Sequence, residues 1–335
     1  MKLAVLHGPG ELRLEEVARP VASACDVVVK VRAAGICGSD IGFLAVGSPT
    51  GGPMALGHEL AGVVTEAGDA VTQFRVGDRV VLNPLVNLIG NGGPEGGFAP
   101  FLLVRDVAAN PESLIHLPDE VSFEEGALVE PLAVSFHAVD RANLKPGAKV
   151  AIFGAGPIGL GIVIALRRKG IDDLVVFDPS RLRRDRAHAL GAKAALNPLA
   201  DTPADELQRL HGAELFCGFL PVAATDVYFD AAGAAGLLPA IIGHAKQGSN
   251  IVLAAVYKRP ETLDLQAVVG KEISIISSLG YGGHLRSLLD DMSELAPAAR
   301  QISTHVLPFA DILEAFDLAR DPEVSSKVLL RFDAA

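Results

Sequence analysis

Residues 150–159 read VAIFGAGPIG, and this stretch decides the fold of the second half of the chain. Its first four residues are apolar, as in a short buried strand. The glycines at positions 154, 156 and 159 have the spacing G-x-G-x-x-G, and residues 158–169 are predicted to form a helix. A strand, a glycine-rich turn and a helix therefore follow one another here.

This order is typical of a dinucleotide-binding unit. In such a unit Gly154 permits the tight turn, Gly156 lets the backbone approach a pyrophosphate, and Gly159 allows the helix to pack closely on the strand. Pro157 and Ile158 begin the helix, whose free N–H groups and partial positive charge favour the anionic pyrophosphate. The alternative is a glycine turn in another kind of α/β protein.

Asp178 ends the next apolar stretch, residues 174–177. Its carboxylate is expected to accept hydrogen bonds from the adenosine ribose and to repel a 2′-phosphate, which favours NAD over NADP. Arg181 and Arg183 follow closely and weaken this preference. Arg183 is itself predicted to bind the cofactor, and the alternative role for Asp178 is helix capping.

The rest of the chain falls into two parts with different patterns. Short strands with Gly and Asp turns, among them residues 26–32 and 62–66, predict a partly closed β-barrel near the N-terminus. From residue 149 onward, strands alternate with helices, and further strands are predicted at residues 194–196, 227–230, 251–254 and 273–277. This alternation predicts an α/β fold with a doubly wound parallel sheet covered on both faces.

Composition limits the classes of partner. The chain has 335 residues, half of them hydrophobic, and a formal net charge of −11. A packed globule is expected, with neither nucleic acid nor an anionic membrane surface as its main partner. Three scattered cysteines are too few for a disulfide framework, so a cytoplasmic location is expected.

Three residues with metal-binding side chains lie far apart in the sequence. Cys37 lies in GICGSD, His58 in GHELAG and Glu130 in LVEPLA. A thiolate, an imidazole and a carboxylate are all suitable zinc ligands, and three of them leave a fourth position for water or an alcohol. Spacing alone does not separate this interpretation from a buried cysteine and a structural histidine.

The surrounding sequences carry a resemblance to a known family. GICGSD, GHELAG, VGDRV, ALVEPLAVSFHAV, GAGPIG and KVLL occur in this order along most of the chain. They resemble the zinc-dependent medium-chain dehydrogenase/reductase family, and most closely its polyol and butanediol dehydrogenase branch. The resemblance implies a GroES-like catalytic domain over residues 1–140 and 279–335, a Rossmann domain over residues 141–278, and an active site in the cleft between them.

The resemblance also implies roles for single residues. One catalytic zinc ion per subunit would be held by Cys37, His58 and Glu130. Glu59 is similar to a residue that lies behind the ligands or replaces one of them. Asp40 would orient the His58 ring, and Ser39 would take the proton of the alcohol. The alternative for Ser39 and Asp40 is turn capping, which both residue types favour.

The chain departs from the family pattern at two places. Many relatives hold a structural zinc with four clustered cysteines, whereas residues 83–98 contain none, so no structural zinc and a shortened lobe are predicted. The glycine-rich segment 90–97 within it is expected to be a loop on the surface or at the lip of the active site. Many relatives also carry a proton-relay histidine where this chain has Gly42.

The expected activity is hydride transfer between NAD and a secondary alcohol, vicinal diol or polyol. Sugar and threonine dehydrogenases of the same family remain open. A zinc-free NAD(P)H quinone or enoyl reductase is disfavoured by the Cys, His and Glu set, and a non-catalytic dinucleotide-binding protein is a further alternative. The resemblance also implies a homodimer or homotetramer, with residues 273–277 as an edge strand that seeks a partner.

Overall fold

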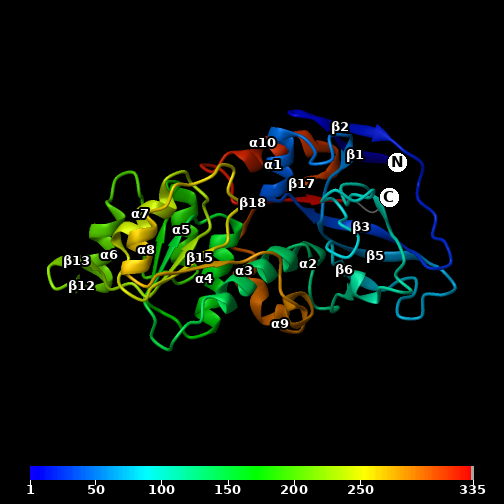
Figure 1. Cartoon of the computed structure of the whole chain (residues 1–335). Helices are drawn as coiled ribbons and strands as arrows, with labels where there is room; N and C mark the ends of the chain where they lie inside the picture. Colours follow the sequence, from blue (N-terminus) through cyan, green and yellow to red (C-terminus); the bar gives the residue numbers. More distant parts are fainter. Residues whose placement is uncertain (333–335) are drawn as a thin grey trace. The chain divides into compact units, whose positions relative to one another are not determined.

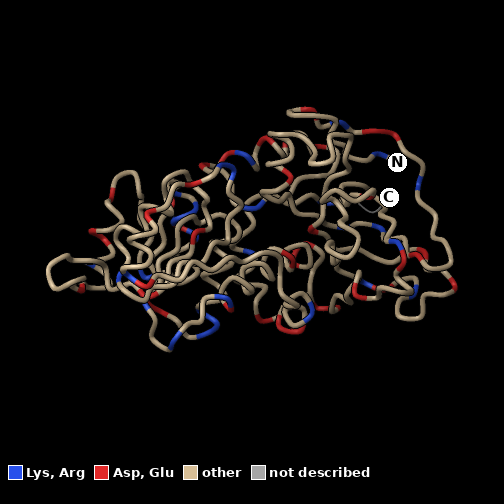
Figure 2. The backbone as a smooth tube through the Cα atoms, in the orientation of Figure 1, with Lys and Arg blue, Asp and Glu red and all other residues tan. Residues whose placement is uncertain are grey.

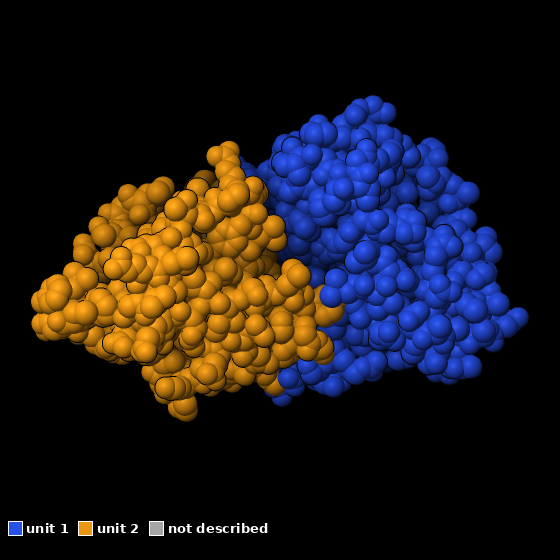
Figure 3. Space-filling view, in the orientation of Figure 1, with its two compact units in different colours: residues 1–130, 285–321, 327–335 blue, residues 131–284, 322–326 orange. Residues whose placement is uncertain are grey.

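Two compact units make up the part of the chain that the computed structural model describes, residues 1–332 (Figure 3). The first unit combines residues 1–130 with residues 285–321 and the C-terminal stretch from Lys327. The second unit combines residues 131–284 with the short segment 322–326. The first unit is therefore built from both ends of the sequence, whereas the second is nearly continuous.

The second unit contains a six-stranded parallel sheet (Figure 1). In spatial order its strands are β11 (Ala194–Leu196), β10 (Leu174–Phe177), β9 (Val150–Phe153), β14 (Val227–Asp230), β15 (Asn250–Leu253) and β16 (Ser274–Ser277). All residues of β9, β10 and β14 are buried, which explains their nearly continuous apolar sequences. The predicted parallel α/β sheet is confirmed.

Strand order places the glycine-rich turn at the centre of this sheet. β9 pairs with β10 on one side and with β14 on the other, with Val150 opposite Leu174 and Val227. The chain thus leaves β9 at the point where the strand order reverses. In open α/β sheets, ligands bind beyond the carboxyl ends of the strands at such a point.

Helices connect the parallel strands. They are α3 (Val129–Arg141), α4 (Pro157–Arg168), α5 (Arg181–Ala189), α6 (Pro203–His211), α7 (Leu237–His244) and α8 (Leu265–Gly270). Leu207 of α6 and Ile241 of α7 pack with Tyr228 of β14 in one buried cluster. An additional hairpin, β12 (Ala213–Phe216) and β13 (Leu220–Ala223), interrupts the expected alternation between α6 and β14.

The first unit is mainly β-structure, as predicted for a GroES-like domain. Its larger sheet has the order β17 (Ser303–Pro308), β18 (Lys327–Arg331), β3 (Val27–Gly35), β5 (Glu59–Ala67), β6 (Arg79–Leu82) and β8 (Leu114–His116), and β7 (Phe101–Val104) also pairs with β3. A smaller sheet contains β2 (Glu11–Glu16), β1 (Lys2–Gly8) and β4 (Met54–Ala55). The unit's helices are α1 (Gly38–Val46), α2 (Phe123–Gly126), α9 (His284–Ala299) and α10 (Ile312–Arg320), with short 3₁₀ turns at Pro111–Ser113 and Phe309–Asp311.

Strand pairing in the larger sheet brings distant sequence segments to one place. Gly35, at the end of β3, pairs with Glu59 at the start of β5 and with Leu329 of β18. Lys327 begins β18, and Gly38 begins α1 just after β3. The ends of these elements therefore position the side chains that the sequence singled out.

Charge and hydropathy follow the expectations for a packed globule. Acidic and basic residues are interspersed along the backbone of both units (Figure 2). Among residues 1–332 no helix is both long enough and apolar enough to span a bilayer.

One buried histidine of the second unit makes stability depend on pH. His211, the last residue of α6, is 2% exposed, and its Nδ1 lies 2.8 Å from Thr225 Oγ1. Burial lowers the pKa of His211 from 6.5 to about 4. As the pH falls from 6.5 towards 4, the unfolded chain binds the proton before the folded one, so folding stability is lost over this window.

We therefore expect His211→Gln to lose less stability on acidification than the wild type. The difference between pH 7.5 and pH 4.5 should be on the order of 2 kcal/mol, because each unit of pKa shift corresponds to about 1.4 kcal/mol. Urea unfolding at several pH values measures it. Parallel stability curves for the two proteins would contradict the assignment.

Candidate functional site

Cys37 lies at the junction between β3 and α1. It occupies the N-cap position of α1, and its backbone N–H donates a hydrogen bond of 2.9 Å to Asp40 Oδ2. Because this bond uses one oxygen of the buried Asp40 carboxylate, it fixes the orientation of the other. The turn GICGSD thus orients a carboxylate as well as presenting a thiol.

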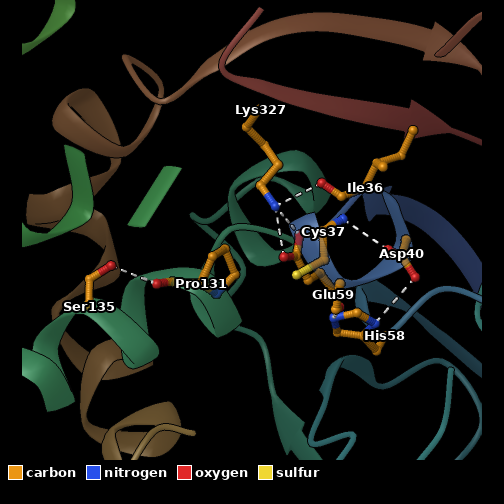
Figure 4. A network of polar contacts seen from close by, with 9 residues as sticks. Ile36, Cys37, Asp40, His58, Glu59, Pro131, Ser135 and Lys327 are labelled. Atoms are coloured by element: carbon orange, nitrogen blue, oxygen red, sulfur yellow. Dashed lines mark hydrogen bonds and ion pairs between the residues drawn. The ribbon is translucent and has the colours of Figure 1, made fainter. Parts of the chain in front are cut away.

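His58 faces that second oxygen. Its Nδ1 lies 3.6 Å from Asp40 Oδ1 (Figure 4), and its Nε2 lies 3.4 Å from Ser39 Oγ. His58 is 3% exposed and Asp40 is fully buried, and neither Nδ1 nor Oδ1 has a hydrogen-bond partner among residues 1–332. A small approach of the two groups lets Nδ1–H donate to Asp40 and leaves Nε2 free to bind a metal.

Glu59 forms a buried ion pair with Lys327. The ammonium Nζ donates to Glu59 Oε1 at 2.7 Å and Oε2 at 2.6 Å, and to the carbonyl of Ile36 at 3.0 Å (Figure 4). Burial lowers the pKa of Lys327, but the negative charges of Glu59 and Cys37 outweigh it and raise the pKa above its ordinary value. Lys327 therefore stays protonated inside the unit.

Glu130 lies in the first turn of α3 and adds another carboxylate to this region. Burial raises the pKa of its carboxyl group, and the charge of Glu59 raises it further. His58 and Lys327 act in the opposite direction. The net effect is a raised pKa, because burial and the charge of Glu59 outweigh these two positive charges.

The arrangement fits a divalent cation. Among residues 1–332, the ligand atoms of Cys37, His58 and Glu59 lie within 4.8 Å of one another. Glu130 is not part of that group of three, although its charge affects His58. A thiol, an imidazole and carboxylates form a donor set that suits zinc.

The glycine-rich turn of the second unit has the form predicted from sequence. Gly154 follows β9 with φ +95°, Gly156 is the N-cap of α4, and Pro157 and Ile158 begin that helix. A Cβ on Gly159 would lie 1.8 Å from the carbonyl oxygen of Gly154. Only glycine permits this approach of helix and turn.

Asp178 and Arg183 lie beside this turn. Asp178 is 4% exposed, and its carboxylate accepts hydrogen bonds from the N–H groups of Ala155 at 2.7 Å and Ser180 at 2.8 Å. Arg183 donates from Nε to the carbonyl of Ser325, and its Nη1 lies 3.7 Å from where a Cβ of Gly156 would be. Asp178 thus ties the glycine-rich turn to the start of α5, which orients its carboxylate.

The buried position of Lys327 was not predicted from the sequence, where KVLL served only as one of the motifs that carry the family resemblance. The available signal was a lysine at the start of an apolar strand. Lysine is almost never fully buried unless it is paired, so a buried acidic partner was to be expected. The partner itself is 268 residues away, and only strand pairing reveals it.

Comparison with known proteins identifies similar chains. Residues 23–118 match the alcohol dehydrogenase GroES-like domain family, and residues 157–296 match the zinc-binding dehydrogenase family. The chain is 30% identical to (R,R)-butanediol dehydrogenase of Bacillus subtilis, over 99% of each chain, and 29% identical to human sorbitol dehydrogenase, over 98% of this chain and 95% of that one.

Solved structures agree with these sequence matches. The crystal structure of 2R,3R-butanediol dehydrogenase from Bacillus subtilis gives a TM-score of 0.83 over 98% of this chain and 99% of that one. A structure from Escherichia coli CFT073, described as a short chain alcohol dehydrogenase in complex with NADH, gives 0.84 at 27% identity over 99% of each chain.

The Lys327–Glu59 pair leads to a testable double-variant cycle. Lys327→Met leaves the Glu59 carboxylate buried without its ammonium partner, so the unfolding free energy of the metal-free protein should fall by about 3–5 kcal/mol. Lys327→Met combined with Glu59→Gln should recover part of this loss, because no unpaired charge remains. Denaturant unfolding of the four proteins in a chelator measures the cycle, and strictly additive losses would show that the two side chains do not interact.

Proposed function

Because the chain belongs to the zinc-binding alcohol and polyol dehydrogenases of the medium-chain dehydrogenase/reductase family, we propose that it transfers hydride between NAD and a secondary alcohol, vicinal diol or polyol. The observation that carries this proposal is the convergence of the ligand atoms of Cys37, His58 and Glu59 in the first unit. The second unit supplies a glycine-rich turn of the dinucleotide-binding type. Butanediol and sorbitol dehydrogenases among the relatives support the substrate class.

Cys37, His58 and Glu130 are the proposed zinc ligands. Glu59 is proposed to lie behind them without binding the metal. Both oxygens of Glu59 already accept hydrogen bonds from Lys327, so binding a metal through Glu59 would disrupt a buried ion pair. Glu130 differs from Glu59, because burial and the negative charge of Glu59 raise the pKa of its carboxyl group. A divalent cation beside Glu130 would supply positive charge that favours its ionised form.

Each remaining polar side chain has a defined task. Zinc, when bound, supplies a Lewis acid that favours the ionised form of an alcohol. Asp40 holds the His58 ring so that Nε2 faces away from the carboxylate. Ser39, whose Oγ lies beside His58 Nε2, accepts the hydroxyl proton of the substrate and passes it towards solvent. Gly42 brings no titratable group to this path.

NAD is the proposed cofactor. The backbone N–H groups at the start of α4 bind the pyrophosphate, since a helix N-terminus favours an anion. Asp178 is held in place by two backbone amides, and a carboxylate has further lone pairs for ribose hydroxyls. Its negative charge disfavours a 2′-phosphate, whereas Arg183 beside Gly156 suits the pyrophosphate charge.

Metal quantification combined with a substrate screen tests this function. Purified protein is assayed with NAD and with NADP against butanediols, sorbitol-like polyols, threonine and simple secondary alcohols. We expect about one zinc per chain and turnover of at least one diol or polyol with NAD. Cys37→Ala should lose both zinc and turnover but retain NADH binding, measured by nucleotide fluorescence, because the nucleotide site lies in the other unit. Turnover by metal-free Cys37→Ala would refute the proposal.

The choice between the two glutamates is tested separately. Glu130→Gln should raise the dissociation constant for zinc by about 100-fold or more, because it removes a ligand. Glu59→Gln should raise it less, by about tenfold, which is the lower end of the effect expected for a group behind the ligands. Competition with a chromogenic chelator measures both constants. The reverse order of effects would make Glu59 the ligand instead.

A further inference from the structure

Residues 83–98 pack directly against the backbone that carries His58. The N–H of Gly97 donates to the carbonyl of Gly57 at 2.8 Å, and the N–H of Phe98 donates to the carbonyl of Leu56 at 3.0 Å. These two acceptors immediately precede His58 in the chain. The position of the histidine therefore depends on a segment that contributes no ligand itself.

Gly90 makes the closest contact between this segment and the histidine turn. A Cβ on Gly90 would lie only 2.2 Å from the carbonyl oxygen of Gly57, and Gly90 has φ +68°. Its own N–H donates to the carbonyl of Glu95 at 2.8 Å. The backbone of the segment thus lies against Gly57. Any larger residue at position 90 must displace either its own backbone or that of Gly57.

An ion pair closes the segment onto the strand that follows it. Arg105 Nε donates to Glu95 Oε1 at 2.5 Å, and Asn87 Nδ2 donates to the carbonyl of Arg105 at 2.9 Å. The side chain of Glu95 is 12% exposed. Arg105 directly follows β7, whose Val104 pairs with Val27 of β3, the strand that leads to Cys37. The ion pair therefore ties the segment to β7, which pairs with the end of β3 that lies away from Cys37.

Two side chains of this segment belong to the hydrophobic core of the first unit. Ile89 is 1% exposed and Phe98 is fully buried, and the Phe98 ring contacts the Phe316 ring edge-on at 5.9 Å between centroids. The sequence predicted a loop on the surface or at the lip of the active site. Residues 90–97 form neither helix nor strand, as predicted for a loop, and their glycines also allow the backbone to approach residues 55–57 closely.

We propose that the Glu95–Arg105 pair and the Gly90–Gly57 contact form a positioning element for His58. It sets the orientation of the imidazole and so the affinity and geometry of the metal site. Metal ligands must be held within about 10–20° of their productive orientation, and partners behind the ligands change metal affinity by about 10–100-fold. The inference rests on the proposed function, in which His58 binds zinc.

Two variants and a matched control test the element. Glu95→Gln removes the charge while keeping the shape, and Gly90→Ala drives a methyl group towards the Gly57 carbonyl. Gly92→Ala is the control, because Gly92 also has a positive φ, +110°, but nothing lies within 4 Å of its Cβ position. The measurements are the zinc dissociation constant, the visible spectrum of the cobalt-substituted protein, and the unfolding midpoint of the metal-free protein.

We expect Glu95→Gln and Gly90→Ala to raise the zinc dissociation constant about tenfold and to change the cobalt spectrum, which reports ligand geometry. Gly92→Ala should lower the unfolding midpoint without changing either metal readout. A double exchange, Glu95→Arg with Arg105→Glu, should restore the affinity lost in Glu95→Gln. If Gly90→Ala does not fold, the zinc affinities of Glu95→Gln and of the double exchange are sufficient to test the positioning element.

Unchanged affinity and spectrum in folded Glu95→Gln would overturn the inference, as would equal effects in Gly92→Ala and Gly90→Ala. Cys37→Ala separates this outcome from failure of the proposed function. If wild type and Cys37→Ala bind zinc equally, the metal does not use this site, and both proposals fail. If only Cys37→Ala loses zinc while Glu95→Gln keeps wild-type affinity and spectrum, the site stands and the positioning element does not.

Discussion

The buried ion pair between Lys327 and Glu59 is the constraint on which the first unit depends. Burying either charge alone would cost several kcal/mol, so β18 and β5 must both pair in the correct register with β3, which lies between them. That register places Gly35 opposite Glu59 and brings the turn carrying Cys37 beside His58. The pair also occupies both Glu59 oxygens, which leaves the neighbouring Glu130 carboxylate without comparable compensation.

The second unit solves a different problem, the binding of an anionic nucleotide by a chain with net negative charge. Backbone N–H groups at the start of α4 can bind an anion without a basic surface, and the close approach at Gly159 brings the helix against the turn. Asp178 is the acidic exception, and two backbone amides hold its carboxylate in place. In each unit, fixed backbone geometry is thus combined with a buried carboxylate whose hydrogen-bond partners orient it.

Local patterns were sufficient to predict the parallel sheet, whereas the residues around Cys37 and His58 were predicted from the resemblance to a known family. VAIFGAGPIG predicts its own strand, turn and helix, because each residue type there has a local cause. The role of Lys327 could not be predicted in this way, since its partner is set by strand pairing across most of the chain. The hairpin β12–β13 and the tight packing of residues 83–98 were missed for a related reason. Glycine favours both exposed turns and close backbone contact, and only tertiary structure separates the two.

X-ray absorption at the zinc edge of the purified protein tests the central claim most directly. A metal held as described should show one sulfur neighbour at about 2.3 Å and nitrogen or oxygen neighbours at about 2.0–2.2 Å. A variant whose only change is at Cys37 should lose most of its zinc, and any zinc that it retains should show no sulfur neighbour. A first shell without sulfur, or a sulfur that persists in that variant, would contradict the account.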